Sequence, residues 1–256
     1  MIRVLVNGAL GRMGSEVCKK VYSEADLELV GAVDIKEGTV PLGDGVKVTT
    51  DLVAAIEAAK PDVVVDFTRP DVVMGNLRKM LPLGVHAVVG TTGFSDADLK
   101  EVDELARKHN TSLLIAPNFA LGAVVMMKLA CEAAKYFPHV EIIEKHHDNK
   151  LDAPSGTALM LADAINEENN GAYHYVYDRS SVRQKRDPKE IGISSVRGGS
   201  IVGDHEVLFC GPDEVITLKH TAYSRSVFAN GAINAAVYLA KKEPGLYNMG
   251  NMIAEL

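Results

Sequence analysis

The stretch IRVLVNGALGRMG, residues 2–14, decides the fold of this chain. Residues 2–6 form an aliphatic, β-branched run that predicts a strand, and glycines follow at positions 8, 11 and 14. In dinucleotide-binding folds the first glycine permits a tight turn, the second lets the backbone approach a pyrophosphate, and the third brings helix against strand. The spacing is GxxGxxG rather than GxGxxG, so the assignment depends on the surrounding sequence.

The rest of the first half alternates short apolar strands with helices. Strand-like runs lie at residues 27–33, 62–67, 86–90 and 112–119, and helix-like runs at 11–22, 52–59, after Pro70 and at 95–108. Such βαβ units build a parallel sheet that is covered on both faces. The predicted fold class is therefore α/β, with a Rossmann-like, doubly wound parallel sheet.

The pattern changes after Asn118. A helix over about 122–136, a strand over 140–144 and a helix after Ser155 precede a polar stretch, residues 166–189, that we expect to be a solvated loop. The runs 192–199, 200–211 and 214–224 predict antiparallel strands joined by tight glycine turns. These elements predict a second, α+β domain with an open mixed sheet.

The apolar helix predicted over 228–241 needs a large surface to pack on, and we assign it to the first domain. The dinucleotide-binding domain is then discontinuous, comprising residues 1–118 and 227–256. Residues 119–226 form the substrate-binding and oligomerisation domain.

Composition narrows the possible functions. The 256 residues carry a formal net charge of −7, which argues against nucleic-acid and anionic-membrane binding, so an anionic substrate requires a local positive pocket. Cys18, Cys131 and Cys210 lie far apart without CxxC spacing, so we expect reduced thiols rather than disulfides or a zinc site. The chain starts at once with a strand and has no long apolar run, which predicts a soluble, cytoplasmic protein.

Asp34 ends the second predicted strand, twenty residues after Gly14. Its carboxylate could accept hydrogen bonds from both ribose hydroxyls, which favours NADH, whereas Lys36 could pair with the 2′-phosphate of NADPH. Arg12 could cover the pyrophosphate. A turn carboxylate at 34 and a solvent-exposed arginine at 12 remain alternatives, and use of either cofactor stays open.

Two further strand ends predict a rim that faces the nicotinamide. Gly90, Thr91 and Thr92 follow one strand, and the run 116–119 follows the next, at the sheet edge where such folds bind ligands. Ordinary strand-to-helix turns are the alternative.

A second functional cluster lies at EKHHDNKLDAPSGT, residues 144–157, where Lys145, His146, His147 and Lys150 precede a helix start at Ser155. Neighbouring strand residues face opposite ways, so only one histidine should face the reacting atoms. Ser155 is a predicted N-cap, and the positive helix end suits a carboxylate or phosphate. The cluster predicts a site that receives an anion and moves a proton.

Two alternatives to a functional site exist for this cluster. A histidine pair is often a solvated surface pair or a satisfied structural pair. A metal site is not expected, because adjacent histidines diverge and Asp148 provides no i, i+4 partner.

The motifs GALGRMG, DFTRP, GTTGF, APNF, EKHHDNKLDAPSGTA and FANGA together resemble the dihydrodipicolinate reductase family over essentially the whole chain. The resemblance implies reduction of 4-hydroxy-tetrahydrodipicolinate to tetrahydrodipicolinate with NADH or NADPH, in lysine and diaminopimelate biosynthesis. It also implies a homotetramer built on the sheet of the second domain.

The resemblance further implies roles for single residues. His146 matches the general acid/base, Lys150 the proton donor, His147 a substrate contact, and Ser155 with Gly156 and Thr157 the carboxylate-binding turn. The matching cofactor positions are Gly8, Ala9, Leu10, Gly11, Arg12, Met13, Asp34, Gly90, Thr91, Thr92, Ala116, Pro117, Asn118 and Phe119.

Two departures from the family pattern stand out. Asp34 is followed by Ile35 and only then by Lys36, which leaves NADPH preference open, and Asp148 occupies a position where a basic residue is frequent. The alternatives are another two-domain dehydrogenase that acts on an amino-acid-derived aldehyde or imine, and a cofactor-sensing protein without chemistry.

Overall fold

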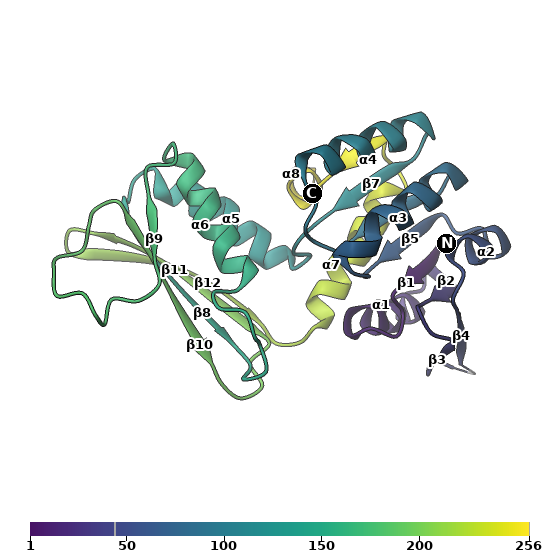
Figure 1. Cartoon of the computed structure of the whole chain (residues 1–256), viewed down its shortest axis with the longest axis horizontal. Coiled ribbons are helices and arrows are strands. Elements are labelled where there is room, and N and C mark those ends of the chain that lie inside the picture. Colours follow the sequence, from purple (N-terminus) through teal and green to yellow (C-terminus); the bar gives the residue numbers. More distant parts are fainter. Residues whose placement is uncertain (44, 256) are drawn as a thin grey trace. The chain divides into compact units, whose positions relative to one another are not determined.

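The computed structural model describes residues 1–43 and 45–255 and divides into two compact units (Figure 1). The first unit comprises Met1–Leu121 and Arg225–Leu256, and the second comprises Gly122–Ser224. The assignment of cofactor binding to the first unit, and of substrate binding and oligomerisation to the second, stays a prediction.

The first unit is built on an eight-stranded sheet with the order β13-β7-β6-β5-β1-β2-β4-β3. All neighbours in it pair in parallel except β3 and β4. The strands are β1 (Ile2–Asn7), β2 (Leu27–Val33), β3 (Gly38–Val40), β4 (Val46–Thr49), β5 (Val63–Asp66), β6 (His86–Val89), β7 (Ser112–Ile115) and β13 (Gly245–Tyr247). The predicted doubly wound parallel sheet is confirmed. The short strands β3, β4 and β13 were not predicted.

Helices connect these strands. They are α1 (Arg12–Ser23), α2 (Leu52–Ala59), α3 (Pro70–Met80) with a 3-10 turn at Leu81–Leu83, α4 (Asp96–Lys108), α7 (Ser226–Leu239) and α8 (Met249–Ala254). Local sequence sets their starts: the side chains of Asp51 and Ser95 accept hydrogen bonds from the first turns of α2 and α4. A core cluster that includes Leu5, Val64 and Leu77 is buried between this sheet and its helices.

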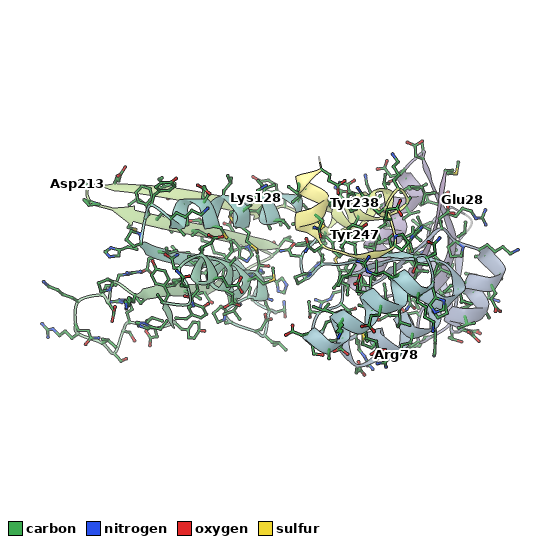
Figure 2. The ribbon with its side chains drawn as sticks, turned by 90° about the horizontal axis from the view of Figure 1, so that it is seen from above. Glu28, Arg78, Lys128, Asp213, Tyr238 and Tyr247 are labelled. Atoms are coloured by element: carbon green, nitrogen blue, oxygen red, sulfur yellow. The ribbon has the colours of Figure 1, made fainter. Side chains whose placement is uncertain are left out.

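The last part of the chain completes the first unit. Strand β13 pairs with β7 at the edge of the sheet. Tyr238 on α7 and Tyr247 on β13 lie edge to face (Figure 2), with their ring centroids 5.8 Å apart. The apolar helix predicted near residues 228–241 thus belongs to the first unit.

The glycine-rich loop leaves no room for side chains at two of its glycines. A Cβ atom at Gly14 would lie 2.0 Å from the carbonyl oxygen of Gly8. Gly8 itself has φ +83, and a Cβ there would lie 2.6 Å from the carbonyl oxygen of Phe67. The close approach of α1 to the end of β1 therefore depends on glycine at position 14.

We expect Gly14→Ala to abolish dinucleotide binding and to lower the free energy of unfolding by about 1–3 kcal/mol, because the added methyl group forces helix and loop apart. Calorimetric titration with NADH and thermal unfolding measure the two effects. The matched control is Gly75→Ala on α3, where an added Cβ meets nothing within 4 Å, and where alanine should stabilise the helix by up to about 1 kcal/mol. Normal NADH binding by Gly14→Ala would contradict the expectation.

The second unit is a five-stranded mixed sheet with the order β12-β11-β8-β10-β9. Its strands are β8 (His139–His146), β9 (His174–Val176), β10 (Glu190–Arg197), β11 (Gly203–Gly211) and β12 (Glu214–Ala222). Helices α5 (Leu121–Ala134) and α6 (Gly156–Glu168) pack on the sheet through a core that includes Met126, Leu161, Ile142 and Phe209 (Figure 1). The predicted α+β unit with an open mixed sheet is confirmed.

Two expectations about this sheet were wrong. Strands β10 and β11 do not pair with each other, because β8 lies between them, parallel to β10 and antiparallel to β11. Only β11 and β12 form the expected hairpin. The polar stretch 166–189 is not all loop: it contains the end of α6 and the edge strand β9, because the rings of Tyr173 and Tyr175 pack against the core.

The three cysteines, Cys18, Cys131 and Cys210, are free thiols. Within residues 1–43 and 45–255, no helix is long and apolar enough to cross a membrane.

Candidate active site

Most N–H groups of the glycine-rich loop are already hydrogen-bonded within the protein, so the donors for a ligand lie at the start of α1. The N–H groups of Gly8 and Ala9 donate to the carbonyl of Val33 over 2.8 and 3.0 Å, and that of Gly11 donates to Gly8 over 3.0 Å. The first N–H groups of a helix have no partner within the helix, so at α1 they begin with Arg12. A pyrophosphate would find its donors there.

Asp34 braces this loop. Its Oδ2 accepts from the N–H of Leu10 over 2.8 Å, and its Oδ1 accepts from the N–H of Ile35 over 2.7 Å. Each carboxylate oxygen can accept a further hydrogen bond, so the turn role and a contact with ribose hydroxyls are compatible.

A cavity of about 840 Å³ opens beside the loop. It brings together five predicted cofactor residues: Gly8, Leu10, Gly11, Asp34 and Lys36. Sequence reasoning missed other lining residues, among them Phe67, Thr68, Arg69, Asn76 and Lys79. The signal for most of them was the DFTRP motif, which follows β5 at the same sheet edge.

Asp66 at the end of β5 fixes part of this lining. Its buried carboxylate accepts from the side-chain amides of Asn7 over 2.7 Å and of Asn76 over 3.0 Å, and from the N–H and hydroxyl of Thr68 over 3.0 and 2.6 Å. Burial raises the pKa of Asp66, although each of these hydrogen bonds opposes the change. The network holds three cavity-lining side chains in place.

A second cavity, of about 410 Å³, contains Thr91, Thr92 and Pro117 beside Phe94 and Tyr247. Two other predicted rim residues lie behind the surface. Ala116 and Phe119 are buried, and the ring of Phe119 lies 5.7 Å from that of Phe67.

Three more of the predicted cofactor positions contribute structure. Gly90 makes room for the ring of Phe67, which a Cβ there would meet at 2.1 Å. The side chain of Asn118 accepts from the N–H of Ala120 over 2.8 Å, and Ala9 is fully buried. Arg12 and Met13 are placed by α1 and line neither cavity.

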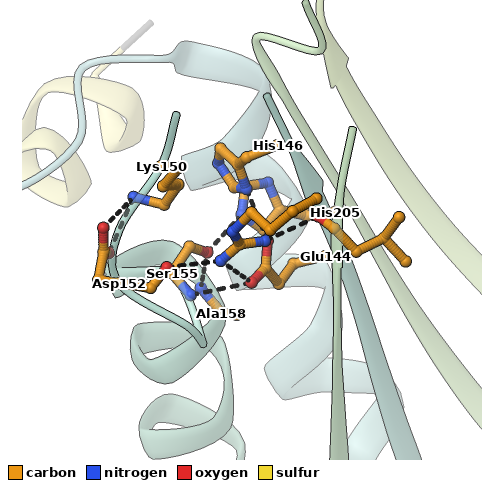
Figure 3. Close-up of polar contacts among 9 residues, drawn as sticks. Glu144, His146, Lys150, Asp152, Ser155, Ala158 and His205 are labelled. Atoms are coloured by element: carbon orange, nitrogen blue, oxygen red, sulfur yellow. Dashed lines mark hydrogen bonds and ion pairs between the residues drawn. The ribbon is translucent and has the colours of Figure 1, made fainter. Parts of the chain in front are cut away.

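In the second unit, the end of β8 carries a histidine held by a buried carboxylate (Figure 3). His146 Nδ1 lies 2.6 Å from Oε2 of Glu144, whose side chain is completely buried. The two residues are two positions apart and share a face of the strand. Arg197, in register with His146 on β10, binds both oxygens of Glu144 over 2.8 and 2.9 Å.

The start of α6 closes this cluster. Ser155 is the N-cap: its hydroxyl accepts from the N–H of Ala158 over 3.2 Å, and its own N–H donates to Glu144 over 3.2 Å. The hydroxyl also lies 3.0 Å from Nε2 of His205 on β11, whose ring centroid is 5.2 Å from that of His146 (Figure 3). Gly156 and Thr157 form the first turn of α6.

The loop between β8 and α6 carries the other predicted groups. Lys150 Nζ forms an ion pair with Asp152, with the closest oxygen at 2.8 Å (Figure 3). The Nδ1 atom of His147 is buried and has no hydrogen-bond partner in the described part of the chain. Asp148 is exposed, so water screens its carboxylate from the cluster.

Lys145 does not join the positive cluster. Its ammonium lies 2.8 Å from Glu206 and 3.7 Å from Asp204. Because it neighbours His146 along β8, it faces the opposite side of the sheet. The four-cation cluster expected from the sequence thus contains three candidate cations, His146, His147 and Lys150, to which Arg197 is added from β10.

The electrostatic environment favours a neutral His146 and an ionised Glu144. Burial lowers the pKa of His146, with the hydrogen bond to Glu144 acting in the opposite direction. For Glu144, burial acts to raise the pKa, but hydrogen bonds from Arg197, Ser195 and His146 outweigh it and lower the pKa to about 2. Burial, aided by the nearby His146, lowers the pKa of His205 to about 4.

The buried His205 should make stability depend on pH. Its pKa in the folded chain, about 4, lies below the ordinary value of 6.5, so the unfolded chain binds the proton first. Stability is then fully present above about pH 6.5 and falls as the pH decreases from 6.5 to 4. We expect urea unfolding, followed by circular dichroism, to show this slope in the wild type and a smaller slope in His205→Gln.

His174→Gln is the matched control, because His174 lies exposed on the edge strand β9. Its slope should equal that of the wild type. An unchanged slope in His205→Gln would show that other groups cause the acid sensitivity.

These two sites define a class of protein. A parallel sheet with a glycine-rich loop and an acidic residue on the second strand is a dinucleotide-binding unit. An imidazole, an ammonium group and a helix start gathered on a second unit suit an anionic substrate that takes up protons. The chain is a two-domain, dinucleotide-dependent oxidoreductase.

Comparisons with known proteins identify the family. The model for the N-terminus of dihydrodipicolinate reductase matches residues 2–119, and the model for its C-terminus matches residues 122–253. The chain belongs to the dihydrodipicolinate reductase family, a family of NAD(P)H-dependent oxidoreductases. The resemblance found in its sequence motifs is confirmed.

Two relatives that match over nearly the whole chain are both named 4-hydroxy-tetrahydrodipicolinate reductase. The 4-hydroxy-tetrahydrodipicolinate reductase of Caldanaerobacter subterraneus subsp. tengcongensis is 42% identical over 255 residues, covering 99% of this chain and 98% of the relative. The protein of that name from Methanosarcina acetivorans is 40% identical over 264 residues, covering 99% of each.

Solved structures agree. A dipicolinate-bound dihydrodipicolinate reductase from Paenisporosarcina sp. TG-14 superimposes with a TM-score of 0.82 at 36% identity, covering 97% of both chains. An amine dehydrogenase from Mycobacterium smegmatis has a TM-score of 0.69 at 16% identity, covering 96% of this chain and 94% of that one, and shares the fold.

Proposed function

We propose that this chain reduces 4-hydroxy-tetrahydrodipicolinate to tetrahydrodipicolinate with NADH or NADPH, as a step of lysine and diaminopimelate biosynthesis. One combination of observations carries this proposal. The chain is similar over its full length to reductases of that name, and its second unit holds the cluster of His146, Lys150 and the start of α6. The similar structure from Paenisporosarcina holds dipicolinate, a cyclic dicarboxylate of the same shape class.

The reaction needs two proton deliveries. In total, substrate, NAD(P)H and one proton give product, NAD(P)⁺ and water. The departing hydroxyl takes a proton as it leaves while the neighbouring ring carbon gives one up, so the loss of water consumes no proton overall. The ring then takes one proton after hydride has added to its conjugated system. Bound NADH or NADPH supplies the hydride. His146, whose neutral ring can take up a proton and return it, and Lys150, an ammonium group in the same loop, are the proposed proton-transfer groups.

The two carboxylates of the substrate need separate anchors. One anchor is the start of α6, at Ser155, Gly156 and Thr157, where the positive end of the helix dipole attracts an anion. His147 offers a buried ring nitrogen without a partner in the described chain, and we assign it a contact with the outer part of the ligand.

The cofactor would lie along the glycine-rich loop of the first unit. The donors at the start of α1 suit the pyrophosphate, and Asp34 suits the adenosine ribose. Lys36 lines the same cavity and offers a charge for a 2′-phosphate. We propose that the enzyme accepts both nicotinamide cofactors.

We further propose that the enzyme is a cytoplasmic homotetramer assembled through the sheet of the second unit. Strand β12 forms one edge of that sheet and exposes apolar side chains, with Val215 56% and Ile216 40% accessible. Apolar surface beside an open strand edge favours association between copies. Analytical ultracentrifugation tests the stoichiometry.

A paired steady-state assay tests the function. The purified enzyme is given the cyclic substrate with NADH and then with NADPH, and oxidation of the cofactor is followed by absorbance. We expect turnover with both, and loss of NADPH use in Lys36→Ala because the 2′-phosphate loses its counter-charge. Preference for an acyclic amino-acid aldehyde or imine would instead support a different dehydrogenase, and cofactor binding without turnover would support a sensing protein.

A further inference from the structure

Glu144 is the most enclosed charged group of the cluster around His146 (Figure 3). Its side chain has no exposed surface, and four hydrogen bonds from three residues reach its two oxygens in addition to the hydrogen bond from Ser195. They come from His146 Nδ1, from both terminal nitrogens of Arg197 and from the backbone N–H of Ser155. A carboxylate only accepts hydrogen bonds, so every one of these groups acts as a donor.

This geometry decides which nitrogen of His146 carries the proton. Because Nδ1 donates to Glu144, the neutral ring has its lone pair on Nε2. The neighbouring position 203 is a glycine, and a Cβ atom added there would come within 3.3 Å of Nε2. The neutral ring therefore presents Nε2 as a hydrogen-bond acceptor beside a residue without a side chain.

Arg197 sets the net charge of the group that hydrogen-bonds His146. A buried carboxylate without a counter-charge would hold the imidazole permanently protonated. Arg197 neutralises Glu144 through two parallel hydrogen bonds and is itself anchored to the carbonyl of Asp152 over 2.6 Å. The pair leaves His146 close to an electrically balanced partner, which lets its proton be exchanged.

We propose that Glu144 and Arg197 are positioning residues of the reductase: Glu144 holds the proton of His146 on Nδ1, and Arg197 balances the charge of Glu144. This inference rests on the proposed function only for the identity of the reaction. The charged and titratable groups that face His146 are Glu144 on its own strand, Arg197 on β10, His205 on β11 and Lys150 in the loop.

Removing the two partners must shift the titration of His146 in opposite directions. Glu144→Gln deletes the negative charge and leaves Arg197 beside the ring, so the pKa of His146 falls. Arg197→Met leaves Glu144 unbalanced, so the pKa of His146 rises. Each shift is expected to be about one unit or more. If Glu144 and Arg197 only stabilised the fold, the two variants would not shift the pKa of His146 in opposite directions.

Nuclear magnetic resonance of the labelled histidine rings measures these shifts without substrate, and the spectrum of His146→Gln assigns the signal. In parallel, kcat of Glu144→Gln should fall by about tenfold or more while KM changes little, because the orientation of the proton-transferring ring matters most in the transition state. Arg197→Lys keeps the charge, so its titration should remain close to that of the wild type.

The matched control is Arg186→Met. Arg186 joins the same two strands near their other ends, with Nε 2.7 Å from Glu141 and Nη2 2.6 Å from the carbonyl of Glu190. We expect it to lower stability and to leave the titration of His146 unchanged. If Arg197→Met does not fold, Glu144→Asp replaces it: the charge stays but withdraws from Nδ1, so kcat should fall with unchanged substrate binding.

Opposite shifts, with the control unmoved, support the proposal. Shifts of equal sign, absent shifts, or full turnover of Glu144→Gln and Glu144→Asp would overturn it. A wild-type enzyme that titrates as described but does not turn over the cyclic substrate would instead reject the proposed function.

Discussion

Replacing His146 by glutamine should lower turnover by about a hundredfold or more, the usual scale for loss of a general acid/base. The amide has nearly the size of the imidazole and can still donate to Glu144, so the cluster should stay intact. What it lacks is a proton that can leave and return near neutral pH. Steady-state oxidation of NADH with the cyclic substrate measures the loss.

The control for this variant is His139→Gln, at the opposite end of β8 and exposed. Its turnover should remain within about twofold of the wild type. The acid limb of the kcat profile should disappear in His146→Gln and persist in His139→Gln. A fully active His146→Gln would remove this residue from the proton pathway.

Lys150→Met is expected to reduce turnover to a similar extent, about a hundredfold. Methionine keeps most of the length and apolar stem of lysine but has neither charge nor proton. The substrate loses a donor and a counter-charge together, so KM should rise as well as kcat fall. Because Asp152 loses its partner 2.8 Å away, the loop should also become more mobile.

Lys145→Met provides the comparison on the same strand. Its ammonium lies with Glu206 on the other side of the sheet, away from the cluster, so turnover should be nearly unchanged. Equal losses in both lysine variants would point to general destabilisation of the second unit. Unchanged turnover in Lys150→Met would make its ammonium an ordinary surface charge.

The fold of the first unit could be predicted because its signals are local. The signals are the apolar strands, the glycine-rich turn and the acidic residue after the second strand. They follow one another closely in the sequence, so each element can be assigned from the residues next to it. Strands β3 and β13 escaped prediction because they are three residues long and gain their stability from pairing with β4 and β7.

The candidate site was only half visible in the sequence. The groups that share one segment, from His146 to Thr157, were found together. Arg197 and His205 were missed because β10 and β11 bring them beside β8 from about fifty residues away. The same pairing error placed β10 next to β11 instead of on the far side of β8. Long-range strand order, which local patterns do not encode, decides both the sheet and the surroundings of His146.

Discontinuity of the first unit has a consequence for synthesis on the ribosome. Residues 122–224 are contiguous and can complete their sheet as soon as they emerge. Strand β7 instead has an unpaired edge until β13 is synthesised, which happens only after the whole second unit. During that interval the nascent chain carries a completed second unit and an incomplete first sheet, whose β7 edge is open to pairing with other strands.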